Sequence, residues 1–102
     1  MSASSLVRRY SAAMHFEWDS AKAQSNRRKH KVTFDDAVSV FYNPWSATFP
    51  DPDSRHAEQR LITVGHSSQE RLLVVVHTEQ GETIRIISAR LATTHERNRH
   101  ES

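Results

Sequence analysis

The spacing of apolar residues predicts a helix over residues 33–43. Its apolar positions recur at i, i+3, i+4 and i+7, the pattern of a helix with one buried face: Phe34, Ala37, Val38 and Phe41. Thr33 and Asp36 form a capping-box pattern at its start, with Val32 placed to pack on Ala37. Pro44 disfavours helical geometry in the residue before it, so the helix should end at Asn43.

A short strand and a polar helix are predicted before that segment. Residues 14–18 read Met-His-Phe-Glu-Trp, which is strand-like, and Asp19 can cap a helix that runs to about His30. This helix is too polar to be buried on all sides, so it should expose a cationic face. Residues 1–13 show no periodicity. We therefore expect a flexible N-terminal extension over 1–13 and a single domain over 14–102.

The second half of the chain predicts a meander of strands. Residues 60–66, 71–78 and 83–89 are β-rich and are joined by short polar segments, which indicates consecutive hairpins. The run 72–76 is apolar throughout and should be the central strand, covered on both faces. Residues 45–60 predict one short strand and then a polar loop. Thr93 and Glu96 form a second capping box, opening a charged helix to about His100.

The order of these elements predicts an α+β domain, with helices packed mainly on one face of a small antiparallel sheet. With 102 residues, the domain is too small for a deep cavity, so a site should be a shallow groove or a sheet face. The absence of cysteine excludes disulfides, thiol nucleophiles and thiolate zinc sites, and it agrees with a cytoplasmic location. No apolar run reaches membrane-spanning length, so we expect no membrane association.

Positive charge is concentrated in two stretches, although the formal net charge is only +2. Such clusters suit an anionic partner more than the net charge suggests. The stretch 20–31 holds no acid and five cations: Lys22, Arg27, Arg28, Lys29 and Lys31. The stretch 85–101 holds four arginines and two acids: Arg85, Arg90, Arg97, Arg99, Glu96 and Glu101.

The seven histidines raise the question of a metal site. His95 and Glu96 begin an H-E pair, but the next histidine is His100, so the spacing of an H-E-x-x-H zinc motif fails. His56 and Glu58 mimic the H-x-E of zinc deaminases, whose cysteines this chain lacks. We therefore expect no metal and no cofactor.

Metal-free cleavage of RNA fits the residues that are present. The 2′-hydroxyl of RNA can attack the neighbouring phosphate, so a protein need only move protons and stabilise charge on the phosphate. Arginine binds phosphate oxygens bidentately and stays charged. The candidate catalytic residues are His30, Glu58, Arg60, Arg85 and Arg90. The candidate RNA contacts are Lys22, Arg27, Arg28, Lys29 and Ser88.

Strand geometry sets a condition on this hypothesis. Strict alternation would place Arg85 and Arg90 on opposite faces, so both can serve one groove only if a bulge or a strand end lies between them. An arginine such as Arg85, inside an otherwise apolar strand, is costly to bury without a partner. His77 ends the central strand and fits a hydrogen-bonded packing role better than that of a base.

These segments resemble the BrnT family of ribonuclease toxins. The similarity spans residues 14–101 in order and covers five motifs: Phe16-Glu17-Trp18-Asp19 with Lys22, Arg28-Lys29-His30 with the apolar positions that follow, the loop Asp51-Pro52 to Glu58 with Arg60, residues 71–79, and residues 84–90. One position departs from the family pattern, since Lys31 stands where the family usually has glycine. Residues 1–13 also precede the usual start.

The resemblance implies a RelE-like fold and a ribonuclease that inhibits translation. It also implies neutralisation by a ribbon-helix-helix antitoxin of the BrnA type, whose complex with the toxin binds operator DNA and represses its own operon. Whether the toxin dimerises in that complex is left open. Two other readings remain: a basic nucleic-acid-binding module without chemistry, and a subunit that binds its antitoxin but has lost catalysis.

Overall fold

The computed structural model describes residues 14–53 and 59–101. Glu58 and the N-terminal segment 1–13, both singled out in the sequence, lie outside the described residues. The elements follow one another as β1 (His15–Glu17), α1 (Ser20–His30), α2 (Phe34–Val40), β2 (Ala47–Pro50), β3 (Leu61–His66), β4 (Leu72–Gln80), β5 (Thr83–Leu91) and α3 (Thr94–Glu101). No helix in these two ranges is both long enough and apolar enough to cross a bilayer.

The strands form one sheet in the order β1-β5-β4-β3-β2. The predicted meander is confirmed, because β3, β4 and β5 pair antiparallel in sequence order and β4 is the central strand. β2 also pairs antiparallel with β3, but β1 lies parallel to β5, so the sheet is mixed. A parallel neighbour requires a long crossover connection, and the chain supplies one through α1, α2 and the rest of the sheet.

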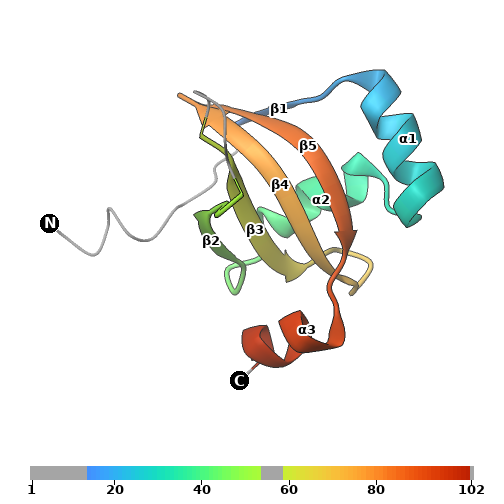
Figure 1. Cartoon of the computed structure of the whole chain (residues 1–102). Coiled ribbons are helices and arrows are strands. Elements are labelled where there is room, and N and C mark those ends of the chain that lie inside the picture. Colours follow the sequence, from blue (N-terminus) through green and yellow to red (C-terminus); the bar gives the residue numbers. More distant parts are fainter. Residues whose placement is uncertain (1–13, 54–58, 102) are drawn as a thin grey trace, which may run out of the picture.

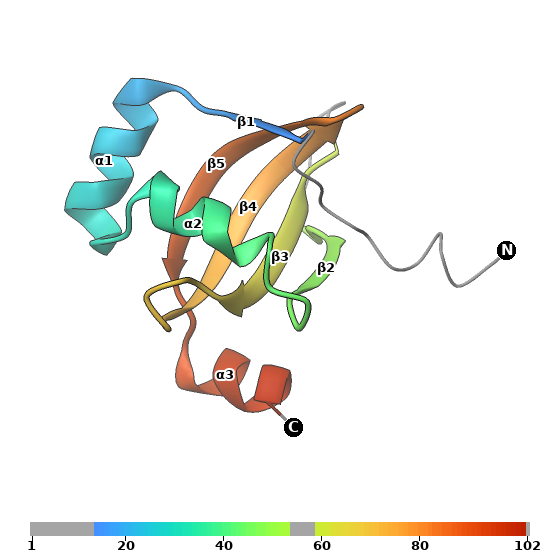
Figure 2. The ribbon, with the colours of Figure 1, turned by 180° about the vertical axis from the view of Figure 1, so that it is seen from behind.

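One face of the sheet carries the main core. α2 packs against this face, behind the sheet in Figure 1 and in front of it in Figure 2. Its apolar stripe meets side chains of β4 and β5 in a cluster that includes Phe34, Ala37, Leu73, Val75 and Ile86. The predicted amphipathic helix is confirmed, although it ends at Val40 and is followed by a turn rather than reaching Asn43.

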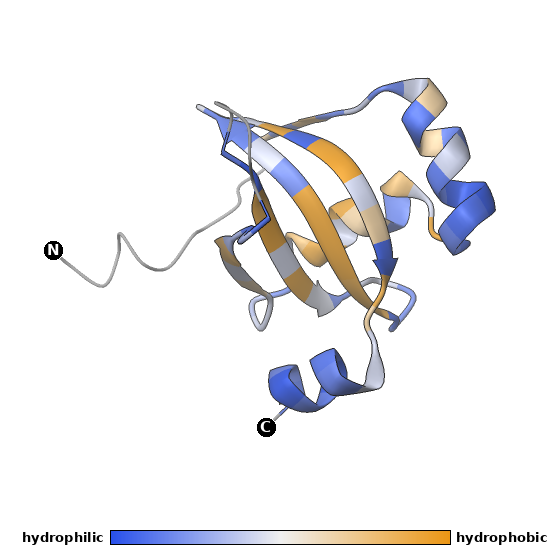
Figure 3. Cartoon of the chain, viewed as in Figure 1, coloured by the Kyte–Doolittle hydropathy of each residue, from blue (hydrophilic) through white to orange (hydrophobic). Residues whose placement is uncertain are grey.

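The opposite face of the sheet is only partly covered by a helix. The prediction that the central strand is buried on both faces nevertheless holds for residues 72–75, and only Val76 of the apolar run is half-buried. Val74 and Leu72 are buried there in a smaller cluster with Val64, and α3 lies over one end of the face only. Figure 3 shows the apolar run of β4 as a hydrophobic stretch in the middle of the sheet. The side chains of this continuous apolar run therefore alternate between two faces. One face is covered by α2, and on the other the side chains are shielded by those of neighbouring strands.

The helix starts follow the predicted capping chemistry. The carboxylate of Asp19 accepts the backbone N–H groups of Ala21 and Lys22, at 2.8 and 3.1 Å. Thr33 accepts the N–H of Asp36, but the carboxylate of Asp36 binds Arg71 instead of completing the box. α1 ends in a tight turn at Lys31, a position that usually holds glycine in the BrnT-like pattern described above. Lys31 takes the left-handed conformation at φ 60°, at a cost of roughly 1 kcal/mol for a residue with a side chain.

Asn26 joins α1 to the outer edge of β5. β1 pairs only with Thr83–Arg85, and beyond that point no described strand lies along this edge of β5, the edge opposite to β4. α1 covers this stretch instead (Figure 1). The buried amide of Asn26 donates to the carbonyl oxygen of Ala89 at 2.8 Å and accepts the N–H of Ala89 at 3.0 Å. It also donates to the carbonyl oxygen of Val32 at 3.0 Å. One side chain thus replaces the hydrogen bonds of a missing strand.

We predict that Asn26→Ala lowers the free energy of unfolding by about 2–4 kcal/mol, because it leaves buried backbone groups without partners. Urea denaturation followed by circular dichroism measures the loss. Asn98→Ala, at an exposed position of α3, is the matched control and should change stability by less than about 0.5 kcal/mol. Equal stability of the two variants would contradict the role given to Asn26.

Candidate functional site

A β-bulge in β5 decides which side chains share a face. Ser88 pairs with Val76 on β4, but the next pair is Ile86 with His77, so the register shifts and Ile87 is an extra residue in β5. An extra residue reverses the alternation of the strand from that point on.

Because of this bulge, Arg85, Ser88 and Arg90 lie on the same, partly covered face of the sheet. Directly paired residues of neighbouring strands point to the same side, and these three pair with Thr78, Val76 and Val74, which alternate along β4. Ile86 and Ala89 keep their places in the core beneath. The bulge that the sequence required between Arg85 and Arg90, if both are to serve one groove, is therefore present.

The end of α1 comes against Ser88 across a small hollow of about 180 Å³. Lys22, Lys29 and His30 line it from the helix, and Ile87 and Ser88 line it from β5. His30 is half-buried, whereas both lysines are exposed. We call this hollow, together with Arg85 and Arg90 on either side of Ser88 along β5, the Ser88 patch. It unites six of the residues predicted from the sequence.

Three other candidates, Arg27, Arg28 and Arg60, do not line the hollow beside Ser88. Arg27 and Arg28 line a different hollow, with Lys31 and Thr33. Arg60 is half-buried directly before β3, and its carbonyl oxygen accepts the N–H of Asp51 at 3.0 Å.

Arg85 forms an exposed ion pair with Glu17 of β1. Its Nη1 lies 3.1 Å from Oε2 of Glu17, and the two side chains are 47% and 54% exposed. Water and salt screen such a pair, so it contributes little to stability and a phosphate can replace the carboxylate. Arg85 also lies close to the start of α1. Hydrogen bonds from the N–H groups of Lys22 and Ala21 lower the pKa of Asp19, and the charges of Lys22 and Arg85 add smaller effects in the same direction.

Arg90 is bound more tightly than Arg85. Its two terminal nitrogens donate to the two carboxylate oxygens of Glu96 at 2.7 and 2.8 Å, and Nη1 also donates to the carbonyl oxygen of Leu91. The predicted capping box of α3 is complete, since Glu96 accepts the N–H of Thr93 and donates its own N–H to the hydroxyl of Thr93. The bidentate pair lowers the pKa of Glu96 to about 2 and raises that of Arg90. Arg90 thus holds α3 against the sheet.

His77 has the packing role expected of it. Its ring is fully buried against Phe41, and Nε2 lies 2.7 Å from the hydroxyl of Thr63, which in turn lies 2.7 Å from that of Thr48. These groups face the helix side of the sheet, away from the Ser88 patch. Within 14–53 and 59–101, no three His, Asp or Glu side chains gather into a group that could hold a metal ion.

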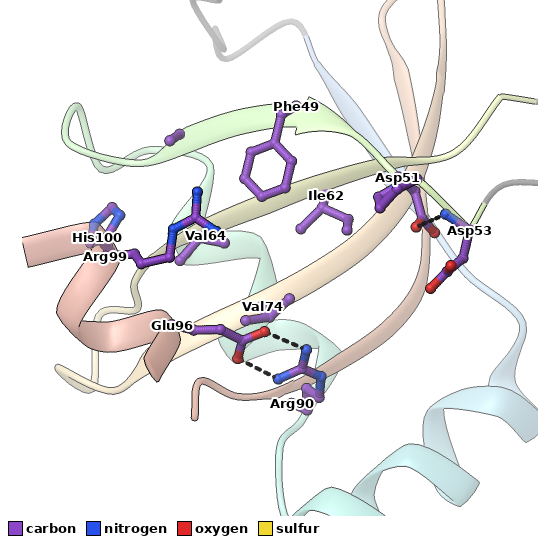
Figure 4. A pocket seen from close by; sticks show the side chains of 12 residues that line it. Phe49, Asp51, Asp53, Ile62, Val64, Val74, Arg90, Glu96, Arg99 and His100 are labelled. Atoms are coloured by element: carbon purple, nitrogen blue, oxygen red, sulfur yellow. Dashed lines mark hydrogen bonds and ion pairs between the residues drawn. The ribbon is translucent and has the colours of Figure 1, made fainter. Parts of the chain in front are cut away.

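A larger pocket, which the sequence did not predict, lies on the partly covered face (Figure 4). It has a volume of about 590 Å³ and lies between β2, β3 and α3. Its floor is apolar and includes Phe49, Ile62, Val64 and Val74, and its rim includes Asp51, Asp53, Arg90, Glu96, Arg99 and His100. The signal in the sequence was Phe49, an aromatic residue in the short strand predicted within 45–60.

Comparison with known proteins identifies the family. The model of a family described as "Ribonuclease toxin, BrnT, of type II toxin-antitoxin system" matches residues 18–96. The chain belongs to the BrnT family. A BrnT crystal structure, that of the Brucella abortus ribonuclease toxin, superimposes with a TM-score of 0.62 at 25% sequence identity, covering 80% of this chain and 100% of that one. No protein with curated functional data matches the chain.

The family resemblance and the α+β fold predicted from the sequence are thereby confirmed. As a BrnT protein, the chain is a ribonuclease toxin of a type II toxin–antitoxin system, and its partner is an antitoxin. The family match itself assigns no role to individual residues of the Ser88 patch.

The Arg90–Glu96 pair predicts how the stability of this BrnT protein changes in acid. The folded state lowers the pKa of Glu96 from 4.5 to about 2, so the pair stabilises the fold fully above pH 4.5 and ceases to do so as the pH falls towards 2. Glu96→Gln should be less stable than the wild type at pH 7, and the difference should shrink between pH 4.5 and pH 2. Urea midpoints measured across this range test the prediction.

The control for this experiment is Glu82→Gln, at an exposed position in the turn between β4 and β5. Its urea midpoints should follow the wild type at every pH. A constant difference between Glu96→Gln and the wild type down to pH 2 would show that the Arg90–Glu96 pair does not titrate as described.

Proposed function

We propose that the chain cleaves RNA at the Ser88 patch without a metal ion and inhibits translation in this way. The observation that supports this most is the bulge at Ile87. It brings Arg85 to the face that Ser88 and Arg90 share by ordinary alternation, and Ser88 also lines the hollow that Lys22, Lys29 and His30 enclose from α1.

In this proposal the substrate supplies its own nucleophile. The 2′-oxygen attacks the adjacent phosphorus and loses its proton, a 2′,3′-cyclic phosphate forms, and the 5′-oxygen leaves with a proton. His30 carries out one of these proton transfers, since imidazole can both accept and donate a proton near neutral pH. Glu58, placed outside the described residues, is the second proton-transfer group on the evidence of the sequence alone.

The cations divide into two roles. Lys22 and Lys29 neutralise the RNA backbone beside Ser88, whose hydroxyl donates to a phosphate oxygen. Arg85 exchanges Glu17 for the phosphate and stabilises the charge that develops during cleavage. Arg90 adds positive charge while it positions α3 through Glu96. Arg27, Arg28 and Arg60 attract the backbone outside the hollow.

We also propose that the neutralising partner is a ribbon-helix-helix antitoxin of the BrnA type, that operator DNA is bound only through the complex of the two, and that the toxin acts in the cytoplasm. The proposal rests on family membership. Covering the Ser88 patch would be the most direct way to silence the enzyme.

We predict that the purified protein cleaves single-stranded RNA in EDTA and that Arg85→Ala lowers the rate by about 10²–10³-fold, because the transition state loses a charged donor. His30→Gln should lower it by at least about 10²-fold. The rate is read from a fluorescent oligoribonucleotide on a denaturing gel. Both variants should keep the unfolding midpoint of the wild type within about 2 °C.

Arg97→Ala is the matched control for Arg85→Ala. Arg97 also forms one exposed ion pair, with Glu101 at 3.4 Å, but on α3 rather than beside Ser88. Its variant should cleave at the wild-type rate. If RNA binds tightly and is never cut in EDTA, the chain is a binding module or needs a metal, and the proposal is wrong.

Expression in bacteria separates a working toxin from a degenerate one. The wild type should arrest growth, and the antitoxin encoded beside it should relieve the arrest. Arg85→Ala, expressed to the same level, should be tolerated and should still bind the antitoxin. Harmless expression of the wild type would favour a subunit that has lost catalysis.

A further inference from the structure

We infer that the pocket between β2, β3 and α3 binds a base of the RNA substrate, and that it prefers a base that carries an amino group. The inference rests on the proposed function, since it extends the same face of the sheet from the cleaved linkage to a neighbouring nucleotide. Its evidence, however, comes from a different part of the molecule.

The size and floor of the pocket suit a flat, largely apolar ring. Its volume of about 590 Å³ lies within the range of small-molecule sites and exceeds what a single purine needs. Ile62, Val64 and Val74 form the floor, and Figure 4 shows Phe49 beside Ile62, its partner in the pairing of β2 with β3. A base placed here would bury apolar surface on both the aliphatic floor and the aromatic ring.

Phe49 is held on the sheet with an exposed ring. It is 44% exposed although it belongs to a paired strand, and alternation along β2 turns it to the same side as Ala47, towards the pocket. Aromatic side chains displayed on a sheet are the common platform for stacking single-stranded bases, because every base has a π-face. Trp45 is even more exposed, at 82%, but it does not line the pocket.

The carboxylates at the rim favour some bases over others. Asp51 and Asp53 lie at one end of the pocket, and Oδ1 of Asp51 accepts the N–H of Asp53 at 2.9 Å, which fixes the direction of the Asp51 carboxylate. Ionised carboxylates only accept hydrogen bonds. Adenine, cytosine and guanine each offer an amino group with two N–H donors, whereas uracil offers a single N3–H that lies between two carbonyl oxygens, which a carboxylate repels. Uracil should therefore be the poorest ligand.

The pocket joins the Ser88 patch at Arg90. Arg90 lines the pocket and pairs with Val74, and Ser88 lies two residues earlier on the same face of β5. Two residues of a strand span about 7 Å, a distance that one nucleotide can bridge. A base in the pocket therefore belongs to a nucleotide adjacent to the phosphate at Ser88, and the pocket would select where the RNA is cut.

Nucleotide binding tests the inference without requiring cleavage. Free 5′-AMP and 5′-UMP are titrated into the full-length wild type, and the methyl signals of Ile62, Val64 and Val74 are followed by NMR. AMP should shift these signals, with a dissociation constant at least about fivefold lower than that of UMP. Phe49→Ala should weaken AMP binding by about tenfold, as expected for the loss of one stacking partner.

Two variants control for indirect effects. Phe49→Tyr keeps an aromatic ring and should bind AMP as the wild type does. Trp45→Ala removes an exposed aromatic ring outside the pocket and should also leave binding unchanged. If AMP and UMP leave the methyl signals unmoved, or if Phe49→Ala binds AMP as well as Trp45→Ala does, the inference is wrong.

The experiment distinguishes a failure of this inference from a failure of the proposed function. RNA cleavage with no nucleotide response in the pocket would overturn the base pocket and leave the ribonuclease site in place. AMP binding with no RNA cleavage would overturn the proposed ribonuclease site and leave the nucleotide pocket in place. A pocket whose signals respond to the antitoxin and never to a nucleotide would be a protein-binding surface, which would also overturn the inference.

Discussion

One extra residue in β5, Ile87, determines what the open face of this domain can do. In a regular strand, one of the two arginines that flank it would point at α2, where an unpaired guanidinium is costly to bury. With the bulge, Ile86 and Ala89 both remain in the core while Arg85, Ser88 and Arg90 face the other way. Asn26 then fixes the backbone at Ala89, directly after the irregular stretch. The same hydrogen bonds hold α1, and with it Lys22 and His30, against Ser88.

The two arginines on this face differ in how freely they can meet a ligand. Arg90 makes a bidentate pair with Glu96, whose pKa falls to about 2, and this pair secures a helix that carries no buried residue of its own. Arg85 makes a single exposed contact with Glu17. Arg90 thus has a structural role, whereas Arg85, on the other side of Ser88, can exchange its carboxylate partner for a phosphate. This fits a small enzyme whose charged groups must be positioned on a sheet surface rather than within a deep cleft.

Local patterns predicted much of this fold. The apolar stripe of α2, the central place of β4 and the capping box at Thr93 follow from spacing and from side chains close in sequence, and the structure confirms each. Three features could not be predicted in this way. The bulge depends on pairing across two strands, and the parallel position of β1 depends on the path of the whole chain. The short strand within 45–60 was predicted and is confirmed as β2, but the exposure of Phe49 on it depends on what packs around the sheet. The sequence also could not show that Arg27 and Arg28 line a different hollow from His30.

The central claim is that RNA is cut beside Ser88, and a structure with a bound substrate analogue tests it most directly. A crystal of the protein with a dinucleotide whose 2′-hydroxyl is methylated would trap the uncleaved linkage. We expect its phosphate within hydrogen-bond distance of Ser88, with Lys22 or Lys29 alongside, His30 next to the blocked oxygen and Arg85 turned from Glu17 to the phosphate. A dinucleotide bound on the α2 side of the sheet, or far from α1 with the Arg85–Glu17 pair intact, would contradict the account.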